Sequence, residues 1–269
     1  MNNLFIFSIL LNLFLYYPSK GQNCSIPKQL SKEIESATTN NNLIEGDFYR
    51  VNKLLFDLEF KNELSTLIHC ESYKKNIRKL LNSDNEIKRV LAYRLIGSAR
   101  DSTFNEKLIE RIKSDETTLL KTWSSTALML TKCAAASDEL FQLFSSYPKG
   151  LPVDVLINMY VQYDSFSVKK TCWKYMDTEN RNQQIMSIQC LASFQHDYAL
   201  QKKLILFLET WDIKSKGWVI SSMSIQKMGN LKPLLEKYGD NENLKNIIVE
   251  ALKNSPTQAD NEYAQELEK

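Results

Sequence analysis

The chain has 269 residues, of which 43% are hydrophobic and 25% charged, and 34 basic against 32 acidic residues leave a net charge of +2. This near balance argues against duplex nucleic acid as a partner, because that binding needs a clear basic excess or a basic stripe. Only 7 glycines and 6 prolines are present. Strand-rich folds need frequent turns built largely from these two residues. The composition therefore favours long helices joined by short polar loops.

The N-terminus is apolar from Leu4 to Tyr17, interrupted only by Ser8 and Asn12. A helix of that length spans about 21 Å, which is too short for a bilayer core of about 30 Å. Small residues in Ser19-Lys20-Gly21 follow. The pattern predicts a signal peptide over residues 1–21, cleavage before Gln22, export of the protein and no transmembrane span in the mature chain. The start lacks Lys and Arg, so an uncleaved anchor or a buried first helix is the alternative.

Five cysteines are scattered along the chain, at Cys24, Cys70, Cys133, Cys172 and Cys190. The odd number and the absence of a CxxC pair indicate neither a disulfide framework nor a zinc site, so no metal is expected. Export would allow one or two disulfides without assigning a pairing. Cys24 follows the apolar run closely, but the preceding residues lack a lipobox, so a lipid anchor at Cys24 is not favoured. Asn23-Cys24-Ser25 forms a glycosylation sequon.

One helical phrase recurs along the chain. An apolar residue starts it, often with Lys next, and residues of buried type follow four, five and eight positions later, on one face of a helix. The first residues of the copies are Phe56, Ile87, Leu120, Val153, Gln183, Ile213 and Leu244, in steps of 30 to 33 residues. The spacing predicts helices that begin near residues 86, 119, 152, 182, 212 and 243.

A second amphipathic stretch lies between successive copies, at residues 104–112, 139–144, 200–208 and 231–238. The polar breaks that follow contain Asp84, Asp115 and Asp240, which we expect to be N-caps of the next helix. Small residues in the phrase, such as Ala92 and Gly217, should let the second helix of each pair approach closely. One such helix pair cannot bury its apolar face alone, whereas stacked pairs bury a continuous core.

The phrase resembles the HEAT-like repeat family, whose pattern is an acidic turn residue, an apolar and a basic residue, then Ala and Leu at helical spacing. The best copies are Asp84-Asn85-Glu86-Ile87-Lys88 with Ala92, and Asp240 to Lys245 with Ala251-Leu252. The resemblance implies an all-α, armadillo-like fold: a right-handed α-solenoid (α-α superhelix) of about seven HEAT-like helix pairs. A helical cap and loop over 22–50 would precede the repeat array at 51–269. An ordinary helical bundle is the alternative.

The sequence contains no convergent catalytic set. His69-Cys70 are adjacent in sequence, and adjacent helical residues point about 100° apart, so they do not form a nucleophile pair. His196-Asp197 is expected in a turn. A HEAT-like nucleic-acid glycosylase would line a groove with basic and aromatic residues; Lys169-Lys170 and Lys202-Lys203 have that composition but fall at different places in their repeats.

These patterns predict a non-enzymatic binding scaffold that presents a helical-repeat surface to a protein or peptide. No cofactor and no small-molecule substrate are indicated. The expected partner contacts lie between the copies at 120 and 213, because aromatic residues are enriched at interface hot spots. They are Tyr160, Tyr163, Trp173, Tyr175 and Trp211, whereas Trp123 and Trp218 are expected to pack the core. The alternative is an enzyme or enzyme accessory on the same fold, for example a glycosylase-like protein.

Overall fold

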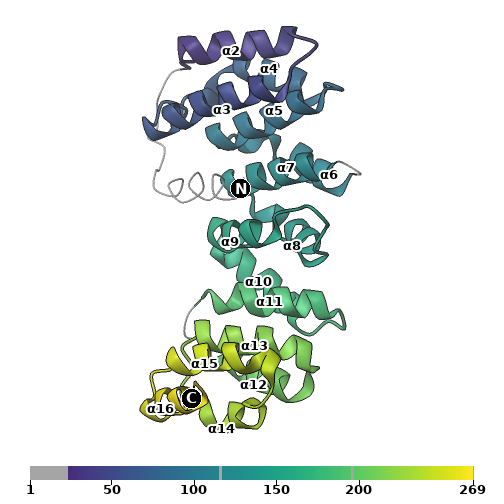
Figure 1. Ribbon diagram of the computed structural model, residues 1–269. Coiled ribbons are helices and arrows are strands. Elements are labelled where there is room, and N and C mark those ends of the chain that lie inside the picture. Colours follow the sequence, from purple (N-terminus) through teal and green to yellow (C-terminus); the bar gives the residue numbers. More distant parts are fainter. Residues whose placement is uncertain (1–23, 115–116, 195–196, 269) are drawn as a thin grey trace. The chain divides into compact units, whose positions relative to one another are not determined.

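The computed structural model describes residues 24–114, 117–194 and 197–268, in which fifteen α-helices and no strand are found (Figure 1). The all-α fold is therefore confirmed for the described residues. The expected signal peptide at 1–21 and the cleavage site before Gln22 lie outside them, as do Asp115 and His196.

The described chain divides into two compact units, residues 24–165 and 166–268. The helices of the first unit are α2 (Lys28–Thr39), α3 (Glu45–Phe60), α4 (Glu71–Leu81), α5 (Glu86–Ala99), α6 (Asn105–Lys113), α7 (Thr118–Leu130), α8 (Ser137–Ser145) and α9 (Val153–Tyr163). Those of the second are α10 (Ser165–Met176), whose first residue ends the first unit, α11 (Arg181–Ala192), α12 (Tyr198–Thr210), α13 (Ile213–Ile225), α14 (Lys232–Leu235), α15 (Glu242–Lys253) and α16 (Gln258–Leu267).

All six predicted helix starts are confirmed to within one residue. They are the first residues of α5, α7, α9, α11, α13 and α15, at positions 86, 118, 153, 181, 213 and 242. The copy at Phe56 is wrong, because α3 begins at Glu45 and ends at Phe60, so Phe56 lies inside a helix that is almost finished. The same helix also crosses the expected boundary between residues 50 and 51.

The helix N-caps lie one or more residues beyond the predicted positions. Asn85 Oδ1 accepts a hydrogen bond from the backbone N–H of Lys88 at 3.1 Å and caps α5. Asn241 caps α15 in the same way, and the Thr117 hydroxyl caps α7. Asp84 and Asp240 are therefore not the caps, because an asparagine follows each of them and supplies the side-chain oxygen at the position where the helix starts.

In the first unit, α3, α5, α7 and α9 pack side by side in sequence, and α2 packs on α4 and α6 on α8 (Figure 1). The helix pairs α4–α5, α6–α7 and α8–α9 also pack against each other. α5 and α7 approach closely, because a Cβ added to Gly97 would lie 2.9 Å from Leu130 Cδ1 and 3.3 Å from Ala127 Cα. This packing leaves no residue of α5 exposed.

The second unit repeats this arrangement with α11, α13 and α15 packed in sequence, α12 against α13 and α16 against α15. A Cβ added to Gly217 of α13 would lie 3.3 Å from Ile247 Cδ1 of α15. Gly97 and Gly217 therefore both lie where neighbouring helix pairs approach closely. For Gly217 the sequence predicted close approach within one pair instead. Stacked helix pairs of this kind are compatible with a helical-repeat protein.

Within the described ranges, no helix is both long enough and apolar enough to cross a membrane.

Candidate functional site

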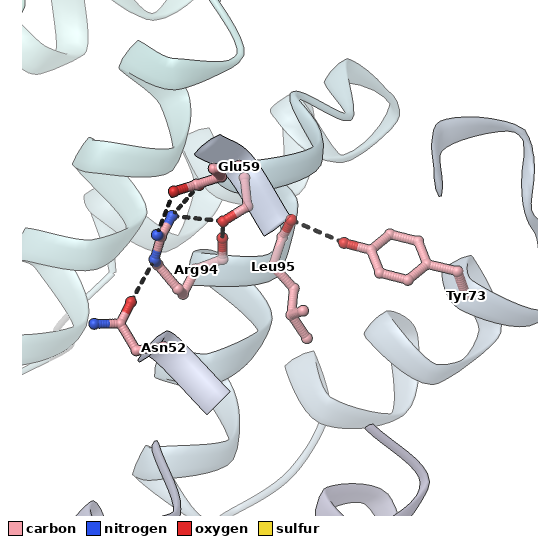
Figure 2. Close-up of polar contacts among 6 residues, drawn as sticks. Asn52, Glu59, Tyr73, Arg94 and Leu95 are labelled. Carbon is pink, nitrogen blue, oxygen red and sulfur yellow. Dashed lines mark hydrogen bonds and ion pairs between the residues drawn. The ribbon is translucent and has the colours of Figure 1, made fainter. Parts of the chain in front are cut away.

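A charged residue is buried in the first unit, where α3 packs on α5. Arg94 of α5 is 3% exposed, and its guanidinium donates to both carboxylate oxygens of Glu59 on α3, at 2.7 and 2.8 Å (Figure 2). Its Nε donates to Asn52 Oδ1 at 2.6 Å, and Nη1 also reaches the Ser98 hydroxyl. Bidentate pairing of this kind adds geometric specificity to the contact between the two helices. Arg94 therefore fixes how α3 lies on α5.

A second buried polar contact supports α5 from the side of α4. The Tyr73 hydroxyl donates to the backbone carbonyl of Leu95 at 2.8 Å, next to Arg94 in the chain (Figure 2). Tyr73 is fully buried, and that burial, with a smaller contribution from the charge of Asp101, holds the pKa of its hydroxyl well above the ordinary value. The hydroxyl is therefore a permanent donor and a structural contact, not an acid or base.

The segment before α2 is tied to the start of α4 by a disulfide between Cys24 and Cys70, with the two Cα atoms 4.9 Å apart. The Thr66 hydroxyl donates to the Ser25 carbonyl at 2.9 Å beside it. Because the Cys70 sulfur is bonded to Cys24, it is not a free thiolate for the neighbouring His69, and the Cys24 sulfur is not free for a lipid thioether. The sequence had left the pairing of both cysteines open.

The aromatic residues predicted as partner contacts are mostly core residues. Tyr160 and Tyr163 of α9 are 0% and 3% exposed. The Tyr160 hydroxyl donates to the Ser137 carbonyl at 3.1 Å, and its ring lies edge-on to Phe144 at 6.0 Å. These two side chains pack the first unit and do not form part of an exposed aromatic patch.

The other three predicted residues belong to the second unit. Tyr175 and Trp211 are buried, and only Trp173 is half-exposed. The Trp211 ring stacks on Phe207 at 4.4 Å, and the Arg181 guanidinium lies 4.1 Å from the centre of the Trp211 ring. Tyr160, Tyr163, Tyr175 and Trp211 therefore do not form an exposed aromatic patch, because their rings are buried. In the same stretch, Phe166 of α10 is 78% exposed.

Three exposed aromatic residues lie together on α3. Tyr49, Phe56 and Phe60 are 59%, 37% and 84% exposed. Their spacings of seven and four residues place them on one line along the helix. We call these three residues the α3 aromatic stripe. The sequence missed it because Phe56 and Phe60 fit the repeat phrase as residues of buried type.

The stripe continues into a partly buried aromatic cluster. The Phe48 ring contacts Tyr49 at 5.8 Å and Trp123 of α7 at 5.2 Å, both edge-on. Tyr49 donates to the Glu45 carboxylate at 3.0 Å, and this bond raises the pKa of the Tyr49 hydroxyl above its ordinary value, so the ring stays neutral. Trp123 is half-buried against Phe48, in agreement with its expected packing role.

The second unit also exposes apolar side chains, on α10, where Phe166 is 78% exposed, and on α12 and α13. Tyr198 and Ile205 of α12 are 77% and 37% exposed, and Trp218 and Ile225 of α13 are 42% and 48% exposed. Trp218, expected in the core, is therefore partly at the surface. Each pair is seven residues apart and occupies one line of its helix.

The surface of the first unit has an open depression beside α4. It measures about 380 Å³, lies between α4 and α6, and half of its lining residues are charged: Glu71, Lys74, Arg78 and Lys107. In the described part of the chain, no three His, Cys, Asp or Glu side chains are grouped as metal ligands.

Comparison with known proteins finds no family model and no curated protein that matches this chain.

Proposed function

We propose that the protein is a non-enzymatic binding module and that the α3 aromatic stripe is its contact surface for a protein partner. The observation that carries the proposal is the exposure of three aromatic rings on one line of a helix that Arg94 holds in place. Aromatic anchors contribute most to affinity when a partner desolvates them. A surface fixed before binding loses less conformational entropy on association.

The chemistry of the stripe indicates the kind of partner. The rings of Tyr49 and Phe60 lie eleven residues apart, which corresponds to about 17 Å along a helix. Arg50, Lys53 and Asp57 alternate with the rings and supply both signs of charge. A polyanion would need a basic surface, so the expected occupant is a protein segment that presents apolar side chains over a similar length.

The proposal includes a finer architecture and a location. We propose that the helix pairs form a right-handed α-solenoid of HEAT-like repeats, which is supported by the even spacing of the six helix starts. We propose that the protein is exported, with residues 1–21 removed. The Cys24–Cys70 disulfide supports this, because structural disulfides persist in oxidising compartments. N-terminal sequencing of natively expressed protein tests it: a retained Met1 in a cytosolic fraction would contradict export.

The binding proposal is tested with the triple variant Y49A/F56A/F60A. The full chain and the variant are tagged, expressed in the source cells and used to capture partners with an amine cross-linker, since Lys53 lies on the stripe between Tyr49 and Phe56. We expect wild type to yield a cross-link from Lys53 to a protein partner. The triple variant should bind that partner at least about tenfold more weakly, since truncation of hot-spot residues costs about 2 kcal/mol or more.

The matched control is Y198A/I205A, which removes exposed apolar side chains from α12 of the other unit. This control should retain the partner, and all three proteins should unfold at similar temperatures, because the truncated side chains are at the surface. Equal capture by wild type and the triple variant contradicts the proposal. So does loss of the partner that is accompanied by a large fall in unfolding temperature, since the stripe would then be part of the core.

A further inference from the structure

α4 carries a dense cluster of basic residues. Six consecutive positions of this helix hold four cations, and its one acidic residue is Glu71. The four cations are Lys74, Lys75, Arg78 and Lys79. Four cations against one carboxylate give α4 alone a net charge of +3, although the whole chain has only +2. A basic cluster of this density is typical of a surface that binds a polyanion.

The helix gathers these four cations on its outer side. Lys74 and Arg78 are four residues apart, as are Lys75 and Lys79, and residues so spaced are neighbours on a helix surface. Lys74 is half-buried, and the other three side chains are exposed. The opposite side of α4 is buried in the first unit through Tyr73, Ile77, Leu80 and Leu81. The four charges therefore face solvent together.

The depression between α4 and α6 adds a fifth cation to this surface. Lys74 and Arg78 line it from α4, and Lys107 lines it from α6. Asn82 and Thr103 also line it and are exposed. An amide and a hydroxyl group donate and accept hydrogen bonds, so the depression offers partners for sugar hydroxyl groups beside the cations.

The position of α4 is fixed at both its start and its buried side. Cys70, which directly precedes the helix, is bonded to Cys24. The Tyr73 hydroxyl donates to the Leu95 carbonyl of α5 at 2.8 Å. A charged surface whose backbone is fixed before binding loses less conformational entropy when a ligand binds.

We propose that the outer side of α4, together with Lys107, binds a sulfated polysaccharide. We call Lys74, Lys75, Arg78, Lys79 and Lys107 the α4 basic surface. Sulfate groups along a polysaccharide complement several neighbouring cations at once. Neither α4 nor α6 exposes a large apolar side chain that would insert into a lipid surface. The choice of a polysaccharide over nucleic acid rests on the proposed export, and the near balance of charge in the whole chain also favours it.

Two carboxylates now hold cations of this surface. Arg78 pairs with Glu71 at 2.6 Å, and Lys107 pairs with Glu110 at 2.7 Å. All four side chains are at least 45% exposed, and exposed ion pairs contribute little to stability. A sulfate group can therefore replace either carboxylate. Glu71 repels such a ligand, so its neutralisation should strengthen binding.

The test titrates the purified full chain with a short heparin oligosaccharide in a calorimeter. We expect binding that weakens as salt rises, because salt screens exposed charges. The variant K74Q/K75Q/R78Q/K79Q should bind at least about tenfold more weakly, since several exposed ion pairs are lost together. Glu71→Gln should bind about twofold more tightly or better, because it removes a competing charge.

The matched control removes four exposed lysines from the second unit, in K170Q/K202Q/K214Q/K245Q. This control changes the net charge equally and should keep the wild-type affinity. The aromatic variant Y49A/F56A/F60A should keep it as well, so failure of the α3 aromatic stripe and failure of the α4 basic surface are distinguished. Similar unfolding temperatures should show that all variants are folded.

Several results would overturn the proposal. They are no binding by wild type, equal binding of a desulfated oligosaccharide of the same length, and an equal loss in the control with four lysines replaced. Tighter binding of a DNA duplex of equal charge would assign the surface to nucleic acid instead. Should the α4 variant fail to fold, Glu71→Gln decides alone: unchanged or weaker binding contradicts the proposal.

Discussion

Arg94 is a charged side chain placed where water does not reach, and its partner Glu59 is also nearly buried, with side chains 3% and 9% exposed. Removing two charges from water is costly, and their attraction offsets that cost only when the geometry is good and the remaining donors are satisfied. Asn52 and Ser98 take the donors that Glu59 leaves. The pair therefore specifies how α3 lies on α5 more than it adds net stability.

We expect Arg94→Met to lower the free energy of unfolding by about 3–5 kcal/mol, because it leaves the Glu59 carboxylate buried without its cation. The double variant R94M/E59M should recover most of that loss, since two apolar side chains of similar size replace the pair. Urea unfolding measures both. Arg50→Met is the control on α3: its ion pair with Glu33 is exposed and should contribute less than about 1 kcal/mol. A double variant as unstable as the single one would contradict this account.

Two adjacent serines of α7 offer an internal comparison. Ser124 and Ser125 are both 0% exposed, but only the Ser124 hydroxyl has a partner, the Leu120 carbonyl at 2.9 Å. The Ser125 hydroxyl has none. A buried polar group without a hydrogen bond is destabilising. The packing of α7 therefore requires a small side chain at position 125 and does not require the hydroxyl group of serine.

Ser125→Ala should raise the free energy of unfolding by about 1–2 kcal/mol, since it removes an unsatisfied hydroxyl and adds helix propensity. Ser124→Ala should change it by less than about 0.5 kcal/mol, because the loss of a satisfied bond offsets the gain in propensity. Thermal unfolding of the two variants beside wild type distinguishes them. Equal effects would mean that the Ser125 hydroxyl is satisfied in solution.

At the scale of the helix, residues other than glycine occupy positions of positive φ at several helix ends. Arg100, Lys132 and Lys227 follow α5, α7 and α13 with φ of 55°, 55° and 50°. In each case the next residue donates its N–H to a carbonyl five positions earlier, as Asp101 does to Ile96. This is the Schellman motif. Its residue of positive φ is usually glycine, because other residues are strained in that conformation.

Lys132→Gly and Lys227→Gly should each stabilise the chain by about 1 kcal/mol, because glycine adopts the left-handed conformation without strain. Both lysines are exposed, so little packing is lost. The control is Lys202→Gly, inside α12 and also exposed, which should destabilise by about 1 kcal/mol through lower helix propensity. Urea unfolding should show a higher free energy of unfolding for Lys132→Gly and Lys227→Gly and a lower one for Lys202→Gly. A lower free energy of unfolding for all three variants would contradict the described helix ends.

At the scale of the whole molecule, the covalent link between Cys24 and Cys70 belongs to one of two units. It joins positions 46 residues apart and attaches the start of α2 to α4. In the chain-entropy account, a loop of this length contributes about 4 kcal/mol by restricting the unfolded chain. The contribution should be confined to the first unit, since the second has its own buried core.

We therefore expect C24S/C70S to exchange amide hydrogens faster in peptides from α2 to α5, while peptides from residues 166–268 keep the wild-type rates. Hydrogen exchange followed by mass spectrometry measures both units in one sample. Wild type treated with a reductant is the matching control and should behave like the variant. Uniformly faster exchange along the chain would show that the two units do not unfold independently.

The sequence by itself determined the helical class and the positions of six helix starts. Both follow from local rules, because a cap and a line of apolar residues at helical spacing are read within about three turns of chain. Even so, the caps at Asn85 and Asn241 lay one residue beyond the predicted aspartates. The start of α3 was missed because the repeat phrase was extended backwards onto Phe56, inside that helix.

Only the tertiary structure decided which lines of apolar side chains along the helices are covered by another helix. Helical spacing shows that Phe56 and Phe60 share a line with Tyr49, but it does not show whether another helix lies over that line. The same limit made Tyr160 and Trp211 look like surface anchors, although neighbouring rings bury them. The Arg94–Glu59 pair and the Cys24–Cys70 bond join residues 35 and 46 positions apart. Contacts over such separations depend on how the helices pack, which no local pattern in the sequence records.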